Sequence, residues 1–212
     1  SILMDLSHHF SNKGDYNAAA WLNDLAFNHF GNDDAVPLEQ AELYLSRGNY
    51  TQAERVLHHG IENGGGIELY VMLCKIYVEQ DKLLDAAELL DKVSDPAIKK
   101  ELETMRPAVP SPSLPAGKYH EYANVTFSSQ NSVVYIREGS EYPSMSTDLH
   151  VGNITLHSGS NNFSCIAVGK NGLVSPLKNY EYIVGGVIEE VQFSDAAMEA
   201  EIRKQLNLPS GT

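Results

Sequence analysis

The sequence predicts a multidomain chain of α and β structure: an α-α superhelix of repeated helix pairs, then a β-sandwich and a terminal helix. A repeat of 34 and then 33 residues, a proline cluster directly after it, and apolar alternation with period two beyond the prolines predict this order. We therefore expect a helical repeat domain over 1–106, a stiff proline-rich linker over 107–115, a β-sandwich over 116–185, and a hinge with a helix over 186–212.

The repeat is visible in three segments that share a turn followed by an alanine. They are Gly14-Asp15-Tyr16-x-x-Ala19, Gly48-Asn49-Tyr50-x-x-Ala53 and Asp81-Lys82-Leu83-x-x-Ala86. Apolar residues at helical spacing on both sides of each segment indicate two helices joined by a tight turn. The small alanine lets the two helices approach closely. Because one helix pair cannot bury both of its faces, the pairs are expected to stack into a solenoid.

This period and pattern resemble the tetratricopeptide repeat (TPR) family over about residues 2–94. Asp95-Pro96 predicts one further helix through Met105, which would cap the array. In the family the first helix of each pair lines a groove that binds a partner. The resemblance therefore implies a partner-binding groove at eight positions: Met4, His8, Leu38, Glu42, Leu45, Val71, Lys75 and Val78.

The predicted groove is apolar and carries few charges. It lacks the Lys/Asn/Arg pattern with which chaperone-binding members of the family grip a C-terminal carboxylate. We expect an extended peptide or a partner helix to lie across it, and the identity of that partner is unknown. A second interpretation stays open, in which these residues pack against missing upstream repeats or against the β domain.

After Arg106 the composition and the apolar period of the sequence change. Four prolines within 107–115 disfavour helix and predict a stiff, extended connector. Beyond it, apolar residues alternate with period two, as in Val125 and Phe127, and turn signals such as Lys170-Asn171-Gly172 separate the runs. Several short strands at regular spacing are typical of a β-sandwich.

The order of features in 108–185 resembles the chitobiase/β-hexosaminidase C-terminal-like domain of bacterial surface proteins. The matching pieces include Pro115-Ala-Gly117-x-Tyr119, Val125-Thr-Phe127, Val134-Tyr135-Ile136-Arg137-Glu138-Gly139-Ser140 and Asn171-Gly172-x-x-Ser175. Arg137 and Glu138 depart from the family's Thr and Asp. The resemblance implies an immunoglobulin-like accessory fold without catalytic residues, and an extracellular or cell-surface location. A cytoplasmic location stays open.

Tyrosines in the second half leave two interpretations open. They are Tyr119, Tyr122, Tyr135, Tyr142, Tyr180 and Tyr182. Aromatic rings can stack on sugar rings, so a carbohydrate- or cell-wall-binding module is the alternative function, with a glycan as partner. Strands and sheet edges also use tyrosine routinely, which is the structural interpretation.

The net charge and the length of the apolar runs limit which partners are expected. The net charge is −13, with −9 in residues 1–106 (9 basic, 18 acidic), −1 in 107–185 and −3 in 186–212. An acidic chain repels phosphate, so nucleic acid is not an expected partner. The longest apolar runs fall short of eighteen residues, which predicts no membrane insertion within this chain.

The search for chemistry predicts no enzyme, no cofactor and no metal site. Neighbours in His8-His9 and His58-His59 point about 100° apart on a helix and cannot hold one ion together. Cys74 and Cys165 stand among apolar residues and are interpreted as small buried hydrophobes. The sequence therefore predicts a non-enzymatic protein–protein interaction scaffold.

The last residues predict a hinge at Gly185-Gly186 and a helix after the N-cap Ser194. The pattern from Val191 to Gly211 resembles the cap that opens leucine-rich repeat regions in bacterial surface proteins. Because the chain starts at Ser1 rather than Met, we expect it to be a piece of a longer protein.

Overall fold

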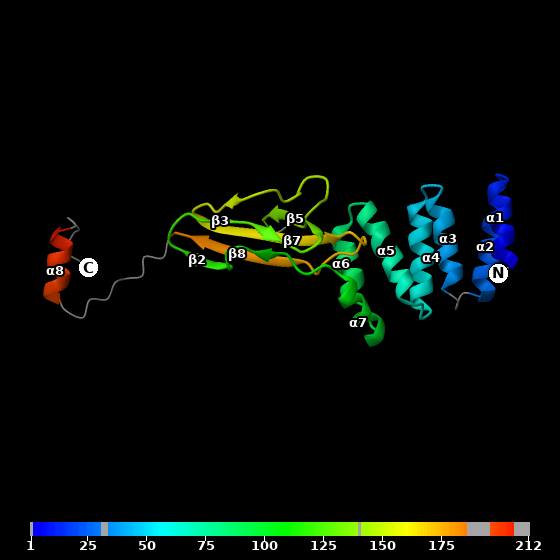
Figure 1. The fold of residues 1–212 in the computed structure, drawn as a ribbon, viewed down its shortest axis with the longest axis horizontal. Helices are drawn as coiled ribbons and strands as arrows, with labels where there is room; N and C mark the ends of the chain where they lie inside the picture. The colour runs from blue at the N-terminus through cyan, green and yellow to red at the C-terminus, as the bar shows by residue number, and fades with distance from the viewer. Residues whose placement is uncertain (1, 31–33, 140, 186–195, 206–212) are drawn as a thin grey trace.

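The computed structural model describes residues 2–30, 34–139, 141–185 and 196–205, and its structure is mixed α and β. The helices of the first half stand side by side in a row, and the strands extend from the end of that row (Figure 1). We call residues 2–106 the helical region and residues 107–185 the β region. The helices of the helical region are α1 (Ile2–Asn12), α2 (Tyr16–Phe30), α3 (Ala35–Leu45), α4 (Tyr50–Glu62), α5 (Ile67–Glu79), α6 (Leu83–Asp91) and α7 (Pro96–Met105).

The first helix of each pair ends in the same turn. A residue two or three positions past the end of the helix has a positive φ in all three turns: 81° at Gly14, 69° at Gly48 and 59° at Asp81. The next N–H donates to the carbonyl five residues earlier, which is the Schellman arrangement. These bonds are Asp15 to Phe10 (2.9 Å), Asn49 to Tyr44 (2.9 Å) and Lys82 to Tyr77 (2.8 Å).

Close packing within each pair depends on one small side chain. Ala19, Ala53 and Ala86 are all 0% exposed, each on the second helix of its pair. A larger residue there would push the two helices apart, because protein interiors have little free volume. The segments that aligned in the sequence therefore occupy equivalent places in the three pairs.

Helix α7 begins at Pro96, the residue at which the sequence predicted a further helix. The carboxylate of Asp95 accepts hydrogen bonds from the N–H groups of Ala97 (2.8 Å) and Ile98 (2.9 Å). A proline at the first helical position needs no donor partner, so the two residues together define the start of the helix. Leu102 is 1% exposed and joins the main core of the helical region.

The β region consists of short strands around one larger sheet. The strands are β1 (Ser111–Pro112), β2 (Gly117–Tyr119), β3 (Asn124–Val125), β4 (Phe127–Ser128), β5 (Ser132–Glu138), β6 (Ile154–Thr155), β7 (Gly159–Gly169) and β8 (Lys178–Val184). The larger sheet has the order β2-β8-β7-β5, with β2 parallel to β8 and the other neighbours antiparallel. Strands β1–β4 and β3–β6 form two smaller antiparallel pairs.

A compact apolar cluster lies inside the β region. Leu156, Cys165 and Tyr182 are 0% exposed, and Phe127 packs its ring 6.0 Å from that of Phe163. The predicted period of two holds along β8 and at the start of β7 but not in the middle of the sheet, where residues 134–136 of β5 and 163–167 of β7 are all buried. The sheet is covered on both faces there, since Cys165 packs in this cluster and Ile166 packs against the helices.

The proline-rich segment is fastened to the sheet and does not run as a separate connector. Ser111 and Pro112 form β1, which pairs with β4. Tyrosine hydroxyls from the larger sheet donate to carbonyl groups along the segment. These bonds are Tyr180 to Pro110 (2.5 Å), Tyr182 to Leu114 (2.8 Å) and Tyr119 to Pro115 (2.5 Å). The predicted linker 107–115 is therefore in part an element of the β region.

The helix near the C-terminus is α8 (Ala196–Gln205). The predicted hinge after Gly185, the N-cap Ser194 and the ends of the leucine-rich-repeat-like pattern lie outside the described residues.

Candidate functional site

The predicted groove residues lie on α1, α3 and α5 and differ in their exposure. Three are exposed, three are partly buried and two are buried. The exposed ones are His8, Glu42 and Lys75, the partly buried ones are Leu38, Leu45 and Val71, and the buried ones are Met4 (2%) and Val78 (9%). Side chains as buried as the last two offer little surface to a partner. The three partly buried residues pack against the main core of the helical region.

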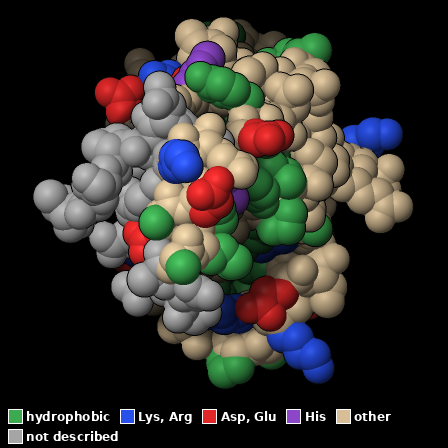
Figure 2. Space-filling view, turned by 90° about the vertical axis from the view of Figure 1, so that its left-hand side faces the viewer, with side chains coloured by type: hydrophobic (Ala, Val, Ile, Leu, Met, Phe, Trp, Pro, Cys, Tyr) green, Lys and Arg blue, Asp and Glu red, His purple; other side chains and the backbone are tan. Residues whose placement is uncertain are grey.

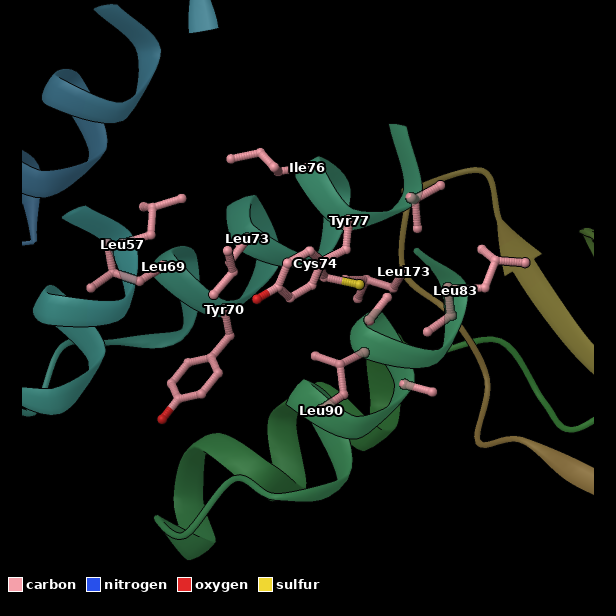
Figure 3. Close-up of a cluster of buried hydrophobic side chains, with 14 of the residues drawn as sticks. Leu57, Leu69, Tyr70, Leu73, Cys74, Ile76, Tyr77, Leu83, Leu90 and Leu173 are labelled. Carbon is pink, nitrogen blue, oxygen red and sulfur yellow. The ribbon is translucent and has the colours of Figure 1, made fainter. Parts of the chain in front are cut away.

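The β region covers the α5 end of this face. The main core of the helical region continues without a break into Tyr135, Ile166, Leu173 and Val174 of the β region. Leu173 lies beside Cys74 and Leu83 in Figure 3. We call this contact area the junction; it corresponds to packing against the β domain, one of the interpretations left open by the sequence.

Backbone of the loop between β7 and β8 touches α5 directly at the junction. The thiol of Cys74 donates to the carbonyl of Gly172 over 3.7 Å. A Cβ atom added to Gly172 would lie 2.8 Å from Cγ of Lys75, so a side chain there would collide with the lysine stem. Glycine at this position therefore permits the close approach of the two regions.

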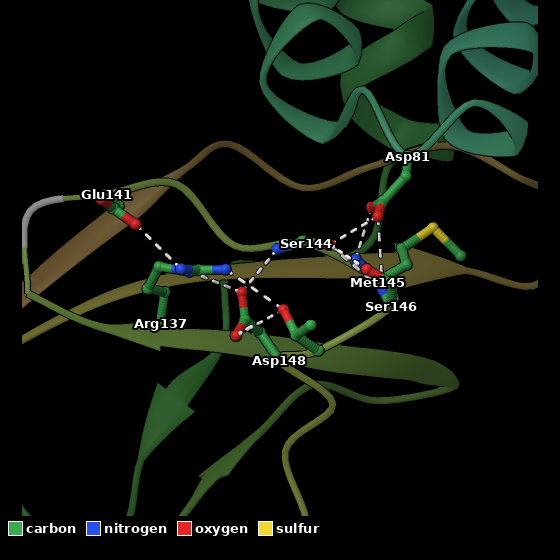
Figure 4. Close-up of polar contacts among 8 residues, drawn as sticks. Asp81, Arg137, Glu141, Ser144, Met145, Ser146 and Asp148 are labelled. Atoms are coloured by element: carbon green, nitrogen blue, oxygen red, sulfur yellow. Dashed lines mark hydrogen bonds and ion pairs between the residues drawn. The ribbon is translucent and has the colours of Figure 1, made fainter.

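The carboxylate of Asp81 ties the turn between α5 and α6 to the loop between β5 and β6 (Figure 4). It accepts hydrogen bonds from the hydroxyl of Ser144 (2.5 Å) and the N–H groups of Met145 (2.5 Å) and Ser146 (3.4 Å). Burial alone would raise the pKa of Asp81, but the hydrogen bonds outweigh it and hold the pKa below its usual value. The charged form of Asp81 is thus the form that joins the regions.

Arg137 braces the same loop from the side of the sheet (Figure 4). Its guanidinium donates to Asp148 (2.8 Å) and Glu141 (2.9 Å). Asp148 also accepts from the N–H of Ser144 (2.8 Å), and these hydrogen bonds lower its pKa despite partial burial, which acts in the opposite direction. The loop that receives Asp81 is therefore also held in shape by contacts within the β region.

A second set of hydrogen bonds joins the end of α7 to the loop between β7 and β8. Arg106 donates through Nε to the carbonyl of Val174 (2.9 Å) and through a terminal nitrogen to Asp91 (2.6 Å). Asn171 donates to the carbonyl of Met105 (2.7 Å). The junction thus has hydrogen bonds at both edges of its apolar centre.

Two hollows lie between successive second helices of the pairs. The α2–α4 groove has a volume of about 400 Å³ and the α4–α6 groove one of about 480 Å³. Their lining residues are related by the repeat: Asp24 and His58 are 34 residues apart, and Val56 and Leu89 are 33 residues apart. The same hollow therefore occurs twice, one repeat apart.

The α4–α6 groove combines buried aromatic rings with acidic edges. Tyr70 and Tyr77 are 8% and 9% exposed, and Nε2 of His58 lies 2.8 Å from the hydroxyl of Tyr77. Burial raises the pKa of Tyr77 to about 12, and the charges of Glu54 and Asp85 act in the same direction. The phenol of Tyr77 therefore stays neutral throughout the physiological range.

Sequence reasoning placed the binding surface on the first helices and did not single out these grooves. In the sequence, His58 stands out only as half of the pair His58-His59. The available signal was the row of acidic residues on the second helices, since Asp85 and Glu88 are three residues apart and share one helix face.

The six tyrosines of the β region have mostly structural contacts. Tyr135 and Tyr182 are buried, and the hydroxyls of Tyr119, Tyr180 and Tyr182 bond the proline-rich segment. Tyr122 and Tyr142 are 74% and 51% exposed.

Viewed from the end opposite α1, single charged side chains are scattered among uncharged ones, and hydrophobic side chains form a strip beside them (Figure 2).

Both cysteine thiols are free and buried. Burial raises the pKa of Cys74 to about 11 and that of Cys165 to about 12. A thiol that stays protonated is a poor nucleophile and a poor metal ligand. The two cysteines therefore act as small apolar core residues at neutral pH.

No family model matches the sequence, and no curated protein matches it either. Within the described residues, no helix has the length and apolar character needed to cross a bilayer. In the same part of the chain, no group of three or more His, Cys, Asp or Glu side chains is arranged to hold a metal ion.

Proposed function

We propose that this chain is a non-enzymatic interaction scaffold. The helical region, as a TPR-type superhelix, binds a segment of a peptide or protein partner, and the β region, as an immunoglobulin-like sandwich, holds it in a fixed orientation. The observation that carries this proposal is the junction. A continuous apolar core with hydrogen bonds at both edges gives a defined geometry, whereas domains on a free linker move relative to one another.

The use of the polar side chains supports a structural role. Asp81 and Asp148 bond backbone N–H groups, and Arg106 bonds a backbone carbonyl. A catalytic group needs access to a substrate and a second group within reach of the reacting atoms. The perturbed carboxyl groups are instead occupied by contacts within the protein.

The charge distribution favours the helical region as the binding part. It carries a net charge of −9, against −1 in the β region. Charge concentrated on one region steers a partner of opposite charge and speeds association. On the first-helix face, His8, Leu38 and Glu42 lie on α1 and α3, whereas α5 contacts the β region.

Peptide display on the intact chain, followed by photo-crosslinking, tests this proposal. We expect selection to enrich peptides that bind saturably and whose photoreactive residue attaches to residues 2–106. A scrambled version of each selected peptide serves as the control. Adducts confined to the β region, or binding equal for selected and scrambled peptides, would show that the helical region is not the receptor.

The cell-surface location implied by the family resemblance is also part of the proposal. A membrane-impermeant reagent applied to intact source cells should label the exposed lysines of the β region, such as Lys118 and Lys170. Labelling seen only after lysis would place the protein inside the cell.

A further inference from the structure

We propose that the α4–α6 groove binds an extended segment of a partner protein through a lysine or arginine side chain. The proposal deepens the proposed function, on which it rests, and moves the contact from the first helices to the second helices. The groove is open to solvent and has a volume of about 480 Å³, enough for a long side chain and the backbone beside it.

The walls of the groove suit the stem of a long side chain. Ile61 and Leu89 are partly buried on α4 and α6, and the rings of Tyr70 and Tyr77 come from α5. Apolar and aromatic walls pack against methylene groups, and a tyrosine face attracts a cation placed over it. Lys82 of this chain lies over the ring of Tyr77, 5.6 Å from its centroid, and pairs with Glu54 (2.9 Å), so the cation of a partner would bind beside the carboxylates of the groove and not on that ring face.

The edges of the groove select the charge of the occupant. Glu62, Asp85 and Glu88 are exposed at its edges, against one lysine, Lys92, which pairs with Glu88 (2.5 Å). Among the described residues, neither Glu62 nor Asp85 forms a direct ion pair, although the charge of Asp85 helps Glu88 to raise the pKa of Lys92. Two carboxylates beside an apolar pocket therefore favour a cationic side chain and disfavour phosphate or an acidic peptide.

The equivalent α2–α4 groove can extend the contact along the array. Gln40 lines it with a side chain that is 1% exposed, and its Nε2 donates to Asp24 (3.3 Å). Its Oε1 accepts no hydrogen bond within the described structure. This oxygen is closed off from solvent, so a bound segment could donate to it only if the Gln40 side chain moved. Because the hollow recurs one repeat along the array, the two grooves together suit an extended chain better than a small free cation.

The test compares two sets of short labelled peptides that are identical except for a central residue, lysine in one and glutamate in the other. Fluorescence anisotropy with the intact chain should detect binding of the lysine set only. In the variant Glu62→Lys with Asp85→Lys, affinity should fall on the order of tenfold or more, because attraction becomes repulsion. The control variant Glu101→Lys with Glu121→Lys makes the same charge change at exposed positions elsewhere and should bind as the parent does.

Several outcomes would overturn the inference. One is an equal loss of affinity for the lysine peptides in the groove variant and in the control variant. Another is equal binding of the lysine and glutamate peptide sets. A third is binding of spermidine that is as strong as that of the peptides and as sensitive to the groove variant. Leu89→Ser is a variant without a change of charge, and unchanged affinity there would show that the apolar wall does not contribute to binding. If display yields helical-region binders that the groove variant leaves intact, this inference fails while the proposed function stands. If no peptide binds, both fail.

Discussion

Asp81 has a φ of 59° in a turn where the two equivalent positions are glycines. The left-handed conformation costs a residue with a side chain about 1–2 kcal/mol, which glycine avoids. The Asp81 carboxylate offsets this by accepting three hydrogen bonds from the loop at residues 144–146. Hydrogen bonds to a charged group contribute about 1.5–3 kcal/mol each, so the contacts outweigh the strain.

We therefore predict that Asp81→Gly destabilises the protein by about 1 kcal/mol or more, although glycine suits the turn. The reverse change, Gly48→Asp, places the same side chain in the same turn without a loop to bind, and should also destabilise by about 1 kcal/mol. Urea unfolding measures both. Amide exchange at Met145 and Ser146 should accelerate in the first variant only; unchanged exchange there would mean that Asp81 does not hold the loop.

The pKa of Cys74 gives a pH dependence of stability with a defined sign. Its value is about 11 in the folded chain against 9.0 for the free thiol. Below pH 9 the thiol is protonated in both states, and between these values the unfolded state loses its proton first. Stability should therefore fall as pH rises from about 9 to about 11. Cys74→Ala should reduce this fall, because alanine does not titrate. The equivalent residue one repeat earlier is Ala41, so alanine suits the position. An identical fall in that variant would exclude Cys74 as a contributor.

At the scale of elements, the contact between the first and second helix pairs is more polar than the contact between the second and third. Asn23 is 0% exposed and neither of its side-chain polar atoms has a partner in the described part of the chain. The equivalent residues, Leu57 and Leu90, are buried leucines. A buried polar group without partners costs about 1–3 kcal/mol.

Asn23→Leu should therefore stabilise the chain by about 1–3 kcal/mol, because the leucine fills a position that is apolar in the other pairs. Thermal unfolding measures the gain, and Asn28→Leu, at an exposed position on the same helix, is the control that should gain little. A loss of stability in Asn23→Leu would mean that the site is too small or that Asn23 has a partner in solution.

Some elements were predictable from sequence because their signals are local. Gly14 and Gly48 identify the helix turns, and Asp95 with Pro96 identifies the start of α7. The fastening of the proline-rich segment was not predictable, since Tyr180 and Pro110 are 70 residues apart and no motif connects them. The grooves between second helices were not predictable for the same reason, because each forms from residues one repeat apart. The family resemblance implies a binding surface on the first helices instead.

At the scale of the whole molecule, the junction predicts that the helical and β regions move as one body. Gly172→Val tests this, because a side chain there would collide with Lys75 and separate the regions. Gly152→Val is the matched control: φ is +79° at Gly172 and +81° at Gly152, but space around Gly152 is open. Both changes strain the backbone by about 1–2 kcal/mol, so only the collision distinguishes them.

Spin labels on cysteines introduced at Lys13 and Lys178, both exposed, report the distance between the regions. The native cysteines are buried and should not react. We expect one narrow distance distribution for the parent and for Gly152→Val, and a broad one for Gly172→Val, since a lost junction leaves only the covalent connection. A broad distribution in the parent would mean that the junction does not persist in solution, and the proposed binding surface of the helical region would then have no fixed orientation toward the β region.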